Sequence, residues 1–267
     1  MLVLLPPSEG KADPVERAAS GSLDWGDLSL PGLNTARKAV AEELVELCAH
    51  DPERAREVLG LSTGQRAEVT RNAELYSTPV LPAAALYTGV LYEALGLSDL
   101  GSNAMDRAYR EVLVFSGLWG AVRLSDPLPA YRCSGGVRLP RLGGLGPFWR
   151  SPLQEVVPEQ VGEGLLLDLR SSAYAGMWKP KGELAQRTAT VRVLQSRIVD
   201  GVEKRTVVSH FNKATKGRLL RALLQASRPA TPTELAELLK ELGYQVEAQP
   251  PNRTGSPWRL DVIVTEV

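Results

Sequence analysis

Apolar runs bounded by polar or turn residues predict the first strands of this chain. Leu2–Leu5 is a short apolar run that Pro6 and Pro7 end, and residues 110–117 and 163–169 contain similar runs. These runs are too short, and too β-branched or apolar, for surface helices. We therefore expect three buried strands at these places.

Alternation of apolar and polar residues predicts further strands in the second half. Residues 188–209 alternate on both sides of Asp200-Gly201, and this dipeptide between alternating runs is typical of a hairpin turn. Residues 244–248 and 258–267 also contain strand-like runs around a loop rich in Pro, Asn and Gly. We expect these last two segments to pair as terminal strands.

Helical spacing and capping residues predict several helices. Residues 34–50 have helical apolar spacing behind Asn34 as the expected N-cap, and Asp51-Pro52 suits the start of the next helix. Ser62 with Gln65 is a capping-box pair that predicts a third helix, running to about Tyr76. Two further helical segments are residues 82–96, interrupted near Tyr87–Gly89, and residues 231–243, with Thr231 as cap and Pro232 at the first helical position.

This order of elements indicates a mixed α/β (α+β) protein. Helices dominate early, strands and helices are mixed later, and no linker of convincing length separates them. Hydrophobic residues make up 43% of the chain, which is enough for a sizeable core. We expect one compact domain over residues 1–267, with a mixed sheet flanked by helices.

Composition narrows the location and the kinds of site. No run approaches the roughly eighteen apolar residues of a membrane helix, and residues 1–11 lack the regions of a signal peptide. A cytoplasmic protein without a membrane partner is therefore expected. With two histidines and two cysteines, a multi-histidine metal site and a disulfide framework are not expected. We expect no metal and no cofactor, and among oligomeric states we favour a monomer.

Charge is segregated along the chain although the formal net charge is zero. Residues 1–100 carry 8 basic and 15 acidic residues, a net of −7, whereas residues 164–228 carry 13 basic and 4 acidic residues, a net of +9. Such segregation favours a face for an anionic partner. Segregation in sequence need not become segregation in space, because neighbouring strand residues point to opposite faces.

The segment 208–225 predicts a helix with lysines on its buried side. Its apolar stripe runs through Leu220, Leu223 and Leu224, and steps of three and four residues lead back to Gly217, Lys216 and Lys213. A buried ammonium needs an anionic partner or a water-filled cleft, and the first turns of a helix favour an anion. The alternative is that both lysines extend past the helix end into water.

Two other segments carry polar groups at loops. Residues 169–182 follow an expected strand, and Ser171, Ser172, Tyr174, Lys179 and Lys181 suit phosphate contacts, with Tyr174 or Trp178 able to stack on a base. The aromatic residues could equally belong to the core. Residues 115–141 combine glycines and prolines with four polar side chains, as ordered ligand-binding loops do, although a plain surface loop is an equal alternative. These side chains are Arg123, Asp126, Tyr131 and Arg132.

Five segments together resemble successive blocks of the YaaA family, the peroxide stress proteins. They are residues 4–11, 86–89, 115–132, 169–180 and 209–221, in the order of that family. The resemblance implies a compact mixed α/β domain in the cytoplasm, resistance to hydrogen peroxide by limiting free intracellular iron, and DNA binding in a positively charged cleft. Residues 6–11 read Pro-Pro-Ser-Glu-Gly-Lys where other members have Ser-Pro-Ala-Lys, and the last forty residues diverge, which suggests a distinct branch.

Matched positions imply which residues serve the family's site. They are Lys11, Tyr87, Thr88, Gly89, Ser116, Gly117, Arg123, Asp126, Tyr131, Arg132, Ser172, Tyr174, Lys213 and Gly217.

We combine these residues into a cleft with two walls. Residues 115–141 form one wall, in which Arg123 and Arg132 bind anions and Asp126 holds one of the two guanidinium groups. The opposite wall carries the lysines Lys11, Lys179, Lys213 and Lys216.

Two functions fit such a cleft. The first is a stress protein that binds DNA through these cations, and an open groove would favour it. The second is an enzyme that acts on a small phosphorylated or nucleotide-like substrate, and a closed pocket would favour it. Its catalytic candidates are Lys213, Asp126, Ser172 and Tyr174, with Arg123 and Arg132 as anion-binding partners. An interaction protein without a ligand is a third alternative.

Overall fold

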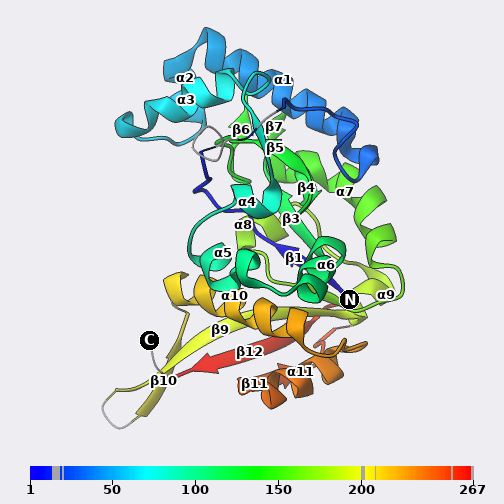
Figure 1. Cartoon of the computed structure of the whole chain (residues 1–267). Helices are drawn as coiled ribbons and strands as arrows, with labels where there is room; N and C mark the ends of the chain where they lie inside the picture. Colours follow the sequence, from blue (N-terminus) through cyan, green and yellow to red (C-terminus); the bar gives the residue numbers. More distant parts are fainter. Residues whose placement is uncertain (14–18, 20, 200–201, 208, 254, 266–267) are drawn as a thin grey trace.

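An eight-stranded mixed sheet organises the molecule (Figure 1). The computed structural model describes residues 1–13, 19, 21–199, 202–207, 209–253 and 255–265. The strand order is β11-β12-β9-β8-β1-β3-β4, and β10 pairs with β9.

The middle of the sheet is parallel. β1 (Leu2–Leu5) lies between β3 (Val112–Ser116) and β8 (Leu166–Asp168), and β8 pairs with β9 (Thr188–Val199). Parallel strands buried on both faces are continuously apolar, and this explains why the three short runs form strands. β4 (Gly120–Arg123) returns antiparallel to β3.

The second half of the sheet also follows the predicted pairing. β12 (Trp258–Val264) is parallel to β9 and antiparallel to β11 (Gln245–Gln249). β10 (Val202–Thr206) is antiparallel to β9, as the hairpin pattern predicts. The expected turn at Asp200-Gly201 lies outside the described residues.

Three helices, α1 (Asn34–His50), α2 (Pro52–Val58) and α3 (Arg66–Ala73), pack together at the top of Figure 1. The Asp51 cap of α2 is confirmed, because its carboxylate accepts the backbone N–H of Arg54. The Ser62–Gln65 capping box is also confirmed, at the short 3-10 turn Thr63–Gln65. The expected N-cap Asn34 is wrong by one residue, since Leu33 occupies that position.

Other helices cover the sheet and position its loops. The predicted break near Tyr87–Gly89 separates α4 (Ala83–Leu86) from α5 (Val90–Leu95), and α10 (Ser209–Gln225) packs along α5 and over β9. α11 (Pro232–Glu241) begins behind Thr231, whose side chain accepts the N–H of Glu234. Four helices were not predicted: α6 (Ser102–Glu111), α7 (Leu145–Val161), α8 (Ser172–Ala175) and α9 (Gly182–Gln186).

Short strands give residues 115–141 more regular structure than a loop. β5 (Pro127–Pro129) pairs with β2 (Val80–Pro82), and β6 (Arg138–Leu139) pairs with β7 (Gly143–Gly144). Two 3-10 turns, Pro31–Leu33 and Leu97–Asp99, complete the elements. The predicted single compact α/β fold is confirmed. Across the described ranges, every helix is too short or too polar to cross a membrane.

Candidate functional site

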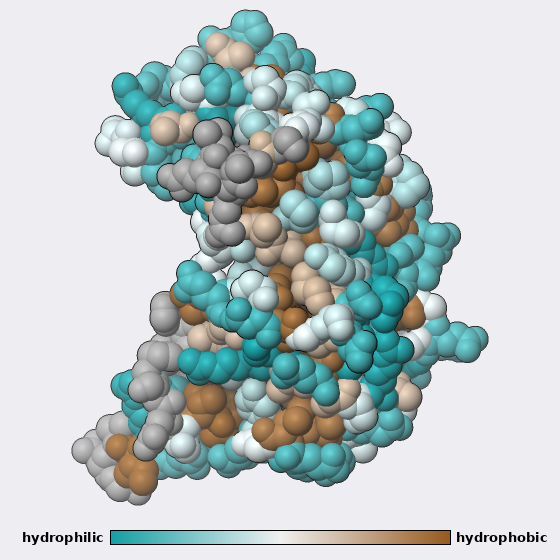
Figure 2. Space-filling view, viewed as in Figure 1, coloured by the Kyte–Doolittle hydropathy of each residue, from teal (hydrophilic) through white to brown (hydrophobic). Residues whose placement is uncertain are grey.

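A cavity of about 770 Å³ lies at the carboxyl ends of the central parallel strands. β1 has β3 on one side and β8 on the other, so the chain moves from β1 to one side and later crosses back to the other side. In open α/β sheets, ligands bind in the crevice that such a reversal of direction opens at the strands' carboxyl ends. The left outline of the molecule in Figure 2 is hollowed between the upper helices and α10.

Five segments line the cavity. They are the loop Pro6–Gly10 after β1, the start of α5 (Gly89–Tyr92), the loop Ser134–Gly136, the segment Leu169–Tyr174 after β8, and the first turns of α10 with Asn212, Lys213 and Lys216. The cavity lining thus contains residues from four of the five segments that carry the family resemblance, namely 4–11, 86–89, 169–180 and 209–221.

The cationic part of the cavity comes from α10. Lys213 is exposed, whereas Lys216 is 8% exposed and donates from Nζ to the carbonyl of Leu169 at 3.1 Å. Burial lowers the pKa of Lys216, and the charge of nearby Asp168 opposes this shift. No carboxylate forms an ion pair with either lysine within the described part of the chain. The exposed residues Ser171 and Ser172 supply hydroxyl groups to the same cavity.

A buried ion pair builds the floor of this part. The guanidinium of Arg170 pairs with Asp168, with Nη2 2.7 Å from Oδ2, and donates to the carbonyls of Tyr174 and Trp178. It also lies over the ring of Phe115, 4.2 Å from the ring centre. Sequence reasoning missed Arg170, although its position after a buried strand was the available signal. Its charge is balanced by Asp168, so Arg170 holds the loop rather than adding a free cation.

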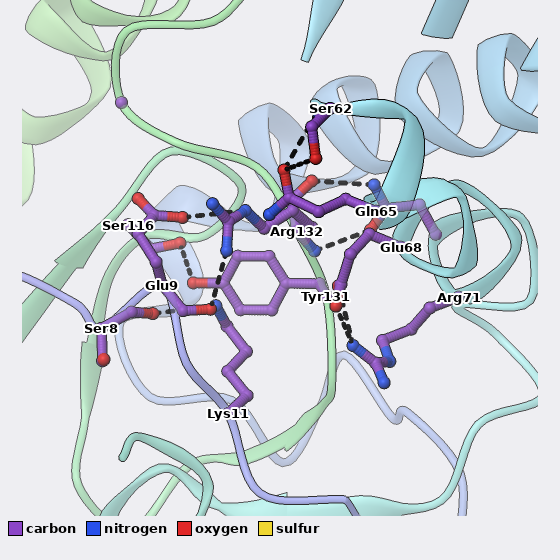
Figure 3. A network of polar contacts seen from close by, with 12 residues as sticks. Ser8, Glu9, Lys11, Ser62, Gln65, Glu68, Arg71, Ser116, Tyr131 and Arg132 are labelled. Atoms are coloured by element: carbon purple, nitrogen blue, oxygen red, sulfur yellow. Dashed lines mark hydrogen bonds and ion pairs between the residues drawn. The ribbon is translucent and has the colours of Figure 1, made fainter. Parts of the chain in front are cut away.

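The opposite part of the cavity contains a carboxylate. Glu9 Oε2 lies 3.2 Å from Arg132 Nε, and Glu9 Oε1 accepts a hydrogen bond from the hydroxyl of Tyr174 at 3.5 Å. Arg132 also donates to the backbone carbonyl of Glu9, and Figure 3 shows its guanidinium beside this loop. Arg132, predicted to bind an anion, is not among the described residues that line the cavity. It contacts Glu9, which does line the cavity. Sequence reasoning missed Glu9 as a site residue.

A chain of hydroxyl groups lies buried behind the cavity. The hydroxyl of Ser116 accepts the backbone N–H groups of Leu118 and Trp119, so it donates its proton to Tyr131, 2.6 Å away. Tyr131 in turn lies 2.9 Å from the hydroxyl of Tyr87. Ser116, Tyr87 and Tyr131 are at most 3% exposed, so these three predicted ligand-binding residues support the site from behind. Thr88 holds the loop Pro6–Gly10, because its backbone N–H donates to the carbonyl of Gly10.

Lys11 lies against this chain of hydroxyls. Its ammonium donates to the carbonyl of Ser8 at 2.9 Å and sits 4.1 Å from the centre of the Tyr131 ring (Figure 3). Burial lowers the pKa of Lys11 to about 8, and the charge of Glu9 opposes this shift. Lys11 is therefore partly neutral near physiological pH, unlike an ordinary lysine.

We expect the Lys11 amine to titrate with a midpoint near pH 8, measured by NMR on the protein labelled at lysine and assigned with Lys11→Met. Because this folded pKa lies below that of the unfolded chain, the unfolded chain binds more protons between pH 8 and about 10.5. The free energy of unfolding of the wild type should rise with pH in that window relative to Lys11→Met. A midpoint above pH 10 would contradict the burial of this amine.

The structure places Arg123, predicted to bind an anion in the cleft, away from the cavity. Its guanidinium donates to the carbonyl of Arg110 and to Gln160 Oε1, at 2.8 Å for the latter. The reason is topological: β4 runs antiparallel to β3, so Arg123 pairs with Leu113 at the amino end of β3. Ser116, at the carboxyl end of β3, lies at the other edge of the sheet, where the cavity is.

The structure gives Asp126 other hydrogen-bond partners than the guanidinium groups of Arg123 and Arg132. Its carboxylate accepts the N–H and the hydroxyl of Ser29 and the backbone N–H of Arg123, and the residue is 2% exposed. These bonds close the turn after β4 and fasten the segment before α1 to it. Asp126 is therefore a structural residue, and its role as a catalytic candidate has no support from its position.

Lys179 lies in a different recess from Lys213. With Arg150, Lys181 and Trp178, it lines a second cavity of about 570 Å³. Several other basic residues of the segment 164–228 pair with acidic residues elsewhere, including Arg192 with Asp261 and Arg228 with Glu111. The net charge of +9 in sequence is thus spread over the molecule rather than gathered in one cleft.

Fold and site together define a mixed α/β protein with a ligand-sized cavity at the carboxyl edge of its parallel strands. A family model described as peroxide stress protein YaaA matches residues 1–250. A UPF0246 protein of Streptomyces coelicolor is 60% identical over 271 residues and covers 100% of both chains. A UPF0246 protein of Corynebacterium efficiens is 38% identical over 250 residues, which are 92% of this chain and 95% of that relative. The chain belongs to the YaaA family of peroxide stress proteins, and the resemblance seen in its sequence is confirmed.

Proposed function

We propose that the protein acts in the response to peroxide stress by binding a phosphate-bearing ligand in this cavity. The observation that carries the proposal is the pair Lys213 and Lys216 on α10, which line the cavity together with the hydroxyl residues Ser171 and Ser172. Ammonium and hydroxyl groups are ordinary phosphate ligands in proteins, and the first turns of a helix favour an anion. Both ammonium groups keep N–H donors for a ligand. Of the two, only Lys216 forms a hydrogen bond with the described residues, to the carbonyl of Leu169.

The cysteines support a role through binding rather than through thiol chemistry. Cys48 and Cys133 are 2% and 4% exposed, and burial raises their pKa values to about 11 and about 12. The thiolate is the form that reacts with peroxide. Buried, protonated thiols are poor peroxide sensors, so we assign the stress function to the ligand site.

DNA is one source of the phosphate, and the resemblance to the YaaA family favours it. A small phosphorylated molecule is the other source, bound or turned over by the protein. The volume of about 770 Å³ and the depth of Lys216 favour the small molecule, because ligand pockets for small molecules have about 300–1,000 Å³ and enclose their ligand. Ser172 and Tyr174 stay candidates for a role in such a reaction, and both line the cavity.

We expect Lys213→Ala to weaken the binding of inorganic phosphate by about tenfold, because a hydrogen bond to a charged group contributes roughly 1.5–3 kcal/mol. Calorimetric titration of wild type and variant measures this change. Lys240→Ala is the matched control, since Lys240 is exposed on α11 and pairs with Glu237. The proposed function would be ruled out if Lys213→Ala changed the binding of neither phosphate nor DNA, or if the wild type bound neither.

A salt titration with a DNA duplex distinguishes the two sources. If DNA is the ligand, log K falls with log salt by about 0.9 per phosphate contact. Three to five contacts then give a slope of about −3 to −5, which Lys213→Ala reduces by about one. If the ligand is small, phosphate binds while the duplex is lost by about 150 mM salt, because exposed charges are screened at that ionic strength.

A further inference from the structure

We infer that the cavity selects a phosphate ester that also carries neighbouring hydroxyl groups, such as a ribonucleotide, and that Glu9 accepts hydrogen bonds from those hydroxyls. This inference rests on the proposed function, because it assumes that the phosphate binds at Lys213 and Lys216. It names the class of ligand and a residue that determines specificity.

The first argument is that Glu9 is presented to the cavity and is held in place. It lines the cavity, and its side chain is 45% exposed. Arg132 is bound to it through two contacts, one to the carboxylate and one to the backbone carbonyl. These two contacts restrict the position of Glu9, so the carboxylate is a fixed acceptor rather than a mobile surface group.

The second argument is that Tyr174 acts as a hydrogen-bond donor toward Glu9, so the bond uses acceptor capacity of the carboxylate. The hydroxyl of Tyr174 accepts the backbone N–H of Gly135 at 3.2 Å, so its own proton is free to point toward Glu9 Oε1. Gly135 permits this contact, because a Cβ there would lie 2.9 Å from the Tyr174 ring. A carboxylate offers about four acceptor sites, and Arg132 and Tyr174 use only part of them. Unused acceptor capacity therefore lies beside the cavity.

The third argument is the polarity of the cavity. Lys213 and Lys216 make one part attractive to an anion, whereas the carboxylate of Glu9 makes another part unfavourable for a second anion and favourable for hydrogen-bond donors. Bare phosphate satisfies only the cationic part, and a polyphosphate brings negative charge to Glu9. A phosphate ester with a diol satisfies both, since carboxylates bind ribose hydroxyls in dinucleotide sites in this manner.

The test compares adenosine monophosphate, its 2′,3′-dideoxy analogue and inorganic phosphate by calorimetric titration of the full chain. We expect the wild type to bind adenosine monophosphate about tenfold more tightly than the dideoxy analogue, as charge-assisted hydrogen bonds imply. In Glu9→Gln this preference should vanish, and inorganic phosphate should bind at least as well as in the wild type. Glu57→Gln is the control, since Glu57 is exposed on α2 and pairs with Arg54.

Three outcomes decide the inference. Loss of the preference in Glu9→Gln, with its thermal unfolding unchanged, supports it. Equal binding of the two nucleotides by the wild type overturns it without using any variant, and the proposed function still stands if phosphate binds. If none of the three probes binds, the proposed function fails and the inference fails with it.

Discussion

Replacing Gly217 with alanine should lower the free energy of unfolding by about 3 kcal/mol or more. A Cβ at this position would lie 2.2 Å from the carbonyl oxygen of Leu91 and 2.9 Å from the side chain of Ala94. Overpacking of this kind costs roughly 1–3 kcal/mol, and more where the neighbour is backbone that cannot move aside. The helices α10 and α5 would have to separate, and both line the cavity.

Chemical denaturation of wild type and Gly217→Ala measures this effect. Gly146→Ala is the matched control, because Gly146 also lies in a helix, α7, and a Cβ there has open space. That change should leave stability unchanged or raise it by up to about 1 kcal/mol. An unfolding midpoint of Gly217→Ala equal to that of the wild type would show that α10 and α5 are not in close contact.

Replacing Asp126 with asparagine should cost roughly 2–4 kcal/mol of stability while phosphate binding by the folded protein is retained. The carboxylate accepts three hydrogen bonds from Ser29 and Arg123, and an amide would turn its NH₂ group toward one of these donors. The variant also removes a negative charge near the buried guanidinium of Arg37, whose charge Asp126 favours.

Thermal unfolding and phosphate titration of the same samples test this expectation. The control is Asp106→Asn, which changes an exposed carboxylate on α6 and should alter neither quantity. A variant with wild-type stability that loses ligand binding would return Asp126 to the site and contradict its structural role.

Most elements of the fold could be predicted from the sequence because their causes are local. The apolar run Leu2–Leu5, the Asp51 cap, the Ser62–Gln65 capping box and the pairing of the strands that flank Asp200-Gly201 depend on residues only a few positions apart. The unpredicted helix α7 contains Pro152 and Pro158 within its span, and prolines there hide a helix from local rules.

The candidate site was predictable only in part, for the same reason. Helical periodicity predicted both Lys213 and Lys216 on the buried side of α10. Lys216 is buried there, whereas Lys213 is exposed, and both line the cavity. Glu9 gave no local signal, because its partners Arg132 and Tyr174 lie 123 and 165 residues away in the chain.

The sequence by itself determined most of the segments that become strands and helices, where several of them begin, and that Lys216 shares a face with buried leucines. Only the tertiary structure decided which polar groups meet. In the tertiary structure, Arg123 lies at the edge of the sheet opposite the cavity, and Asp126 is hydrogen-bonded to Ser29. Glu9 lies between Arg132 and Tyr174 and contacts both. Local propensities act over a few residues, whereas these side-chain contacts depend on the order and direction of strands that are far apart in the chain.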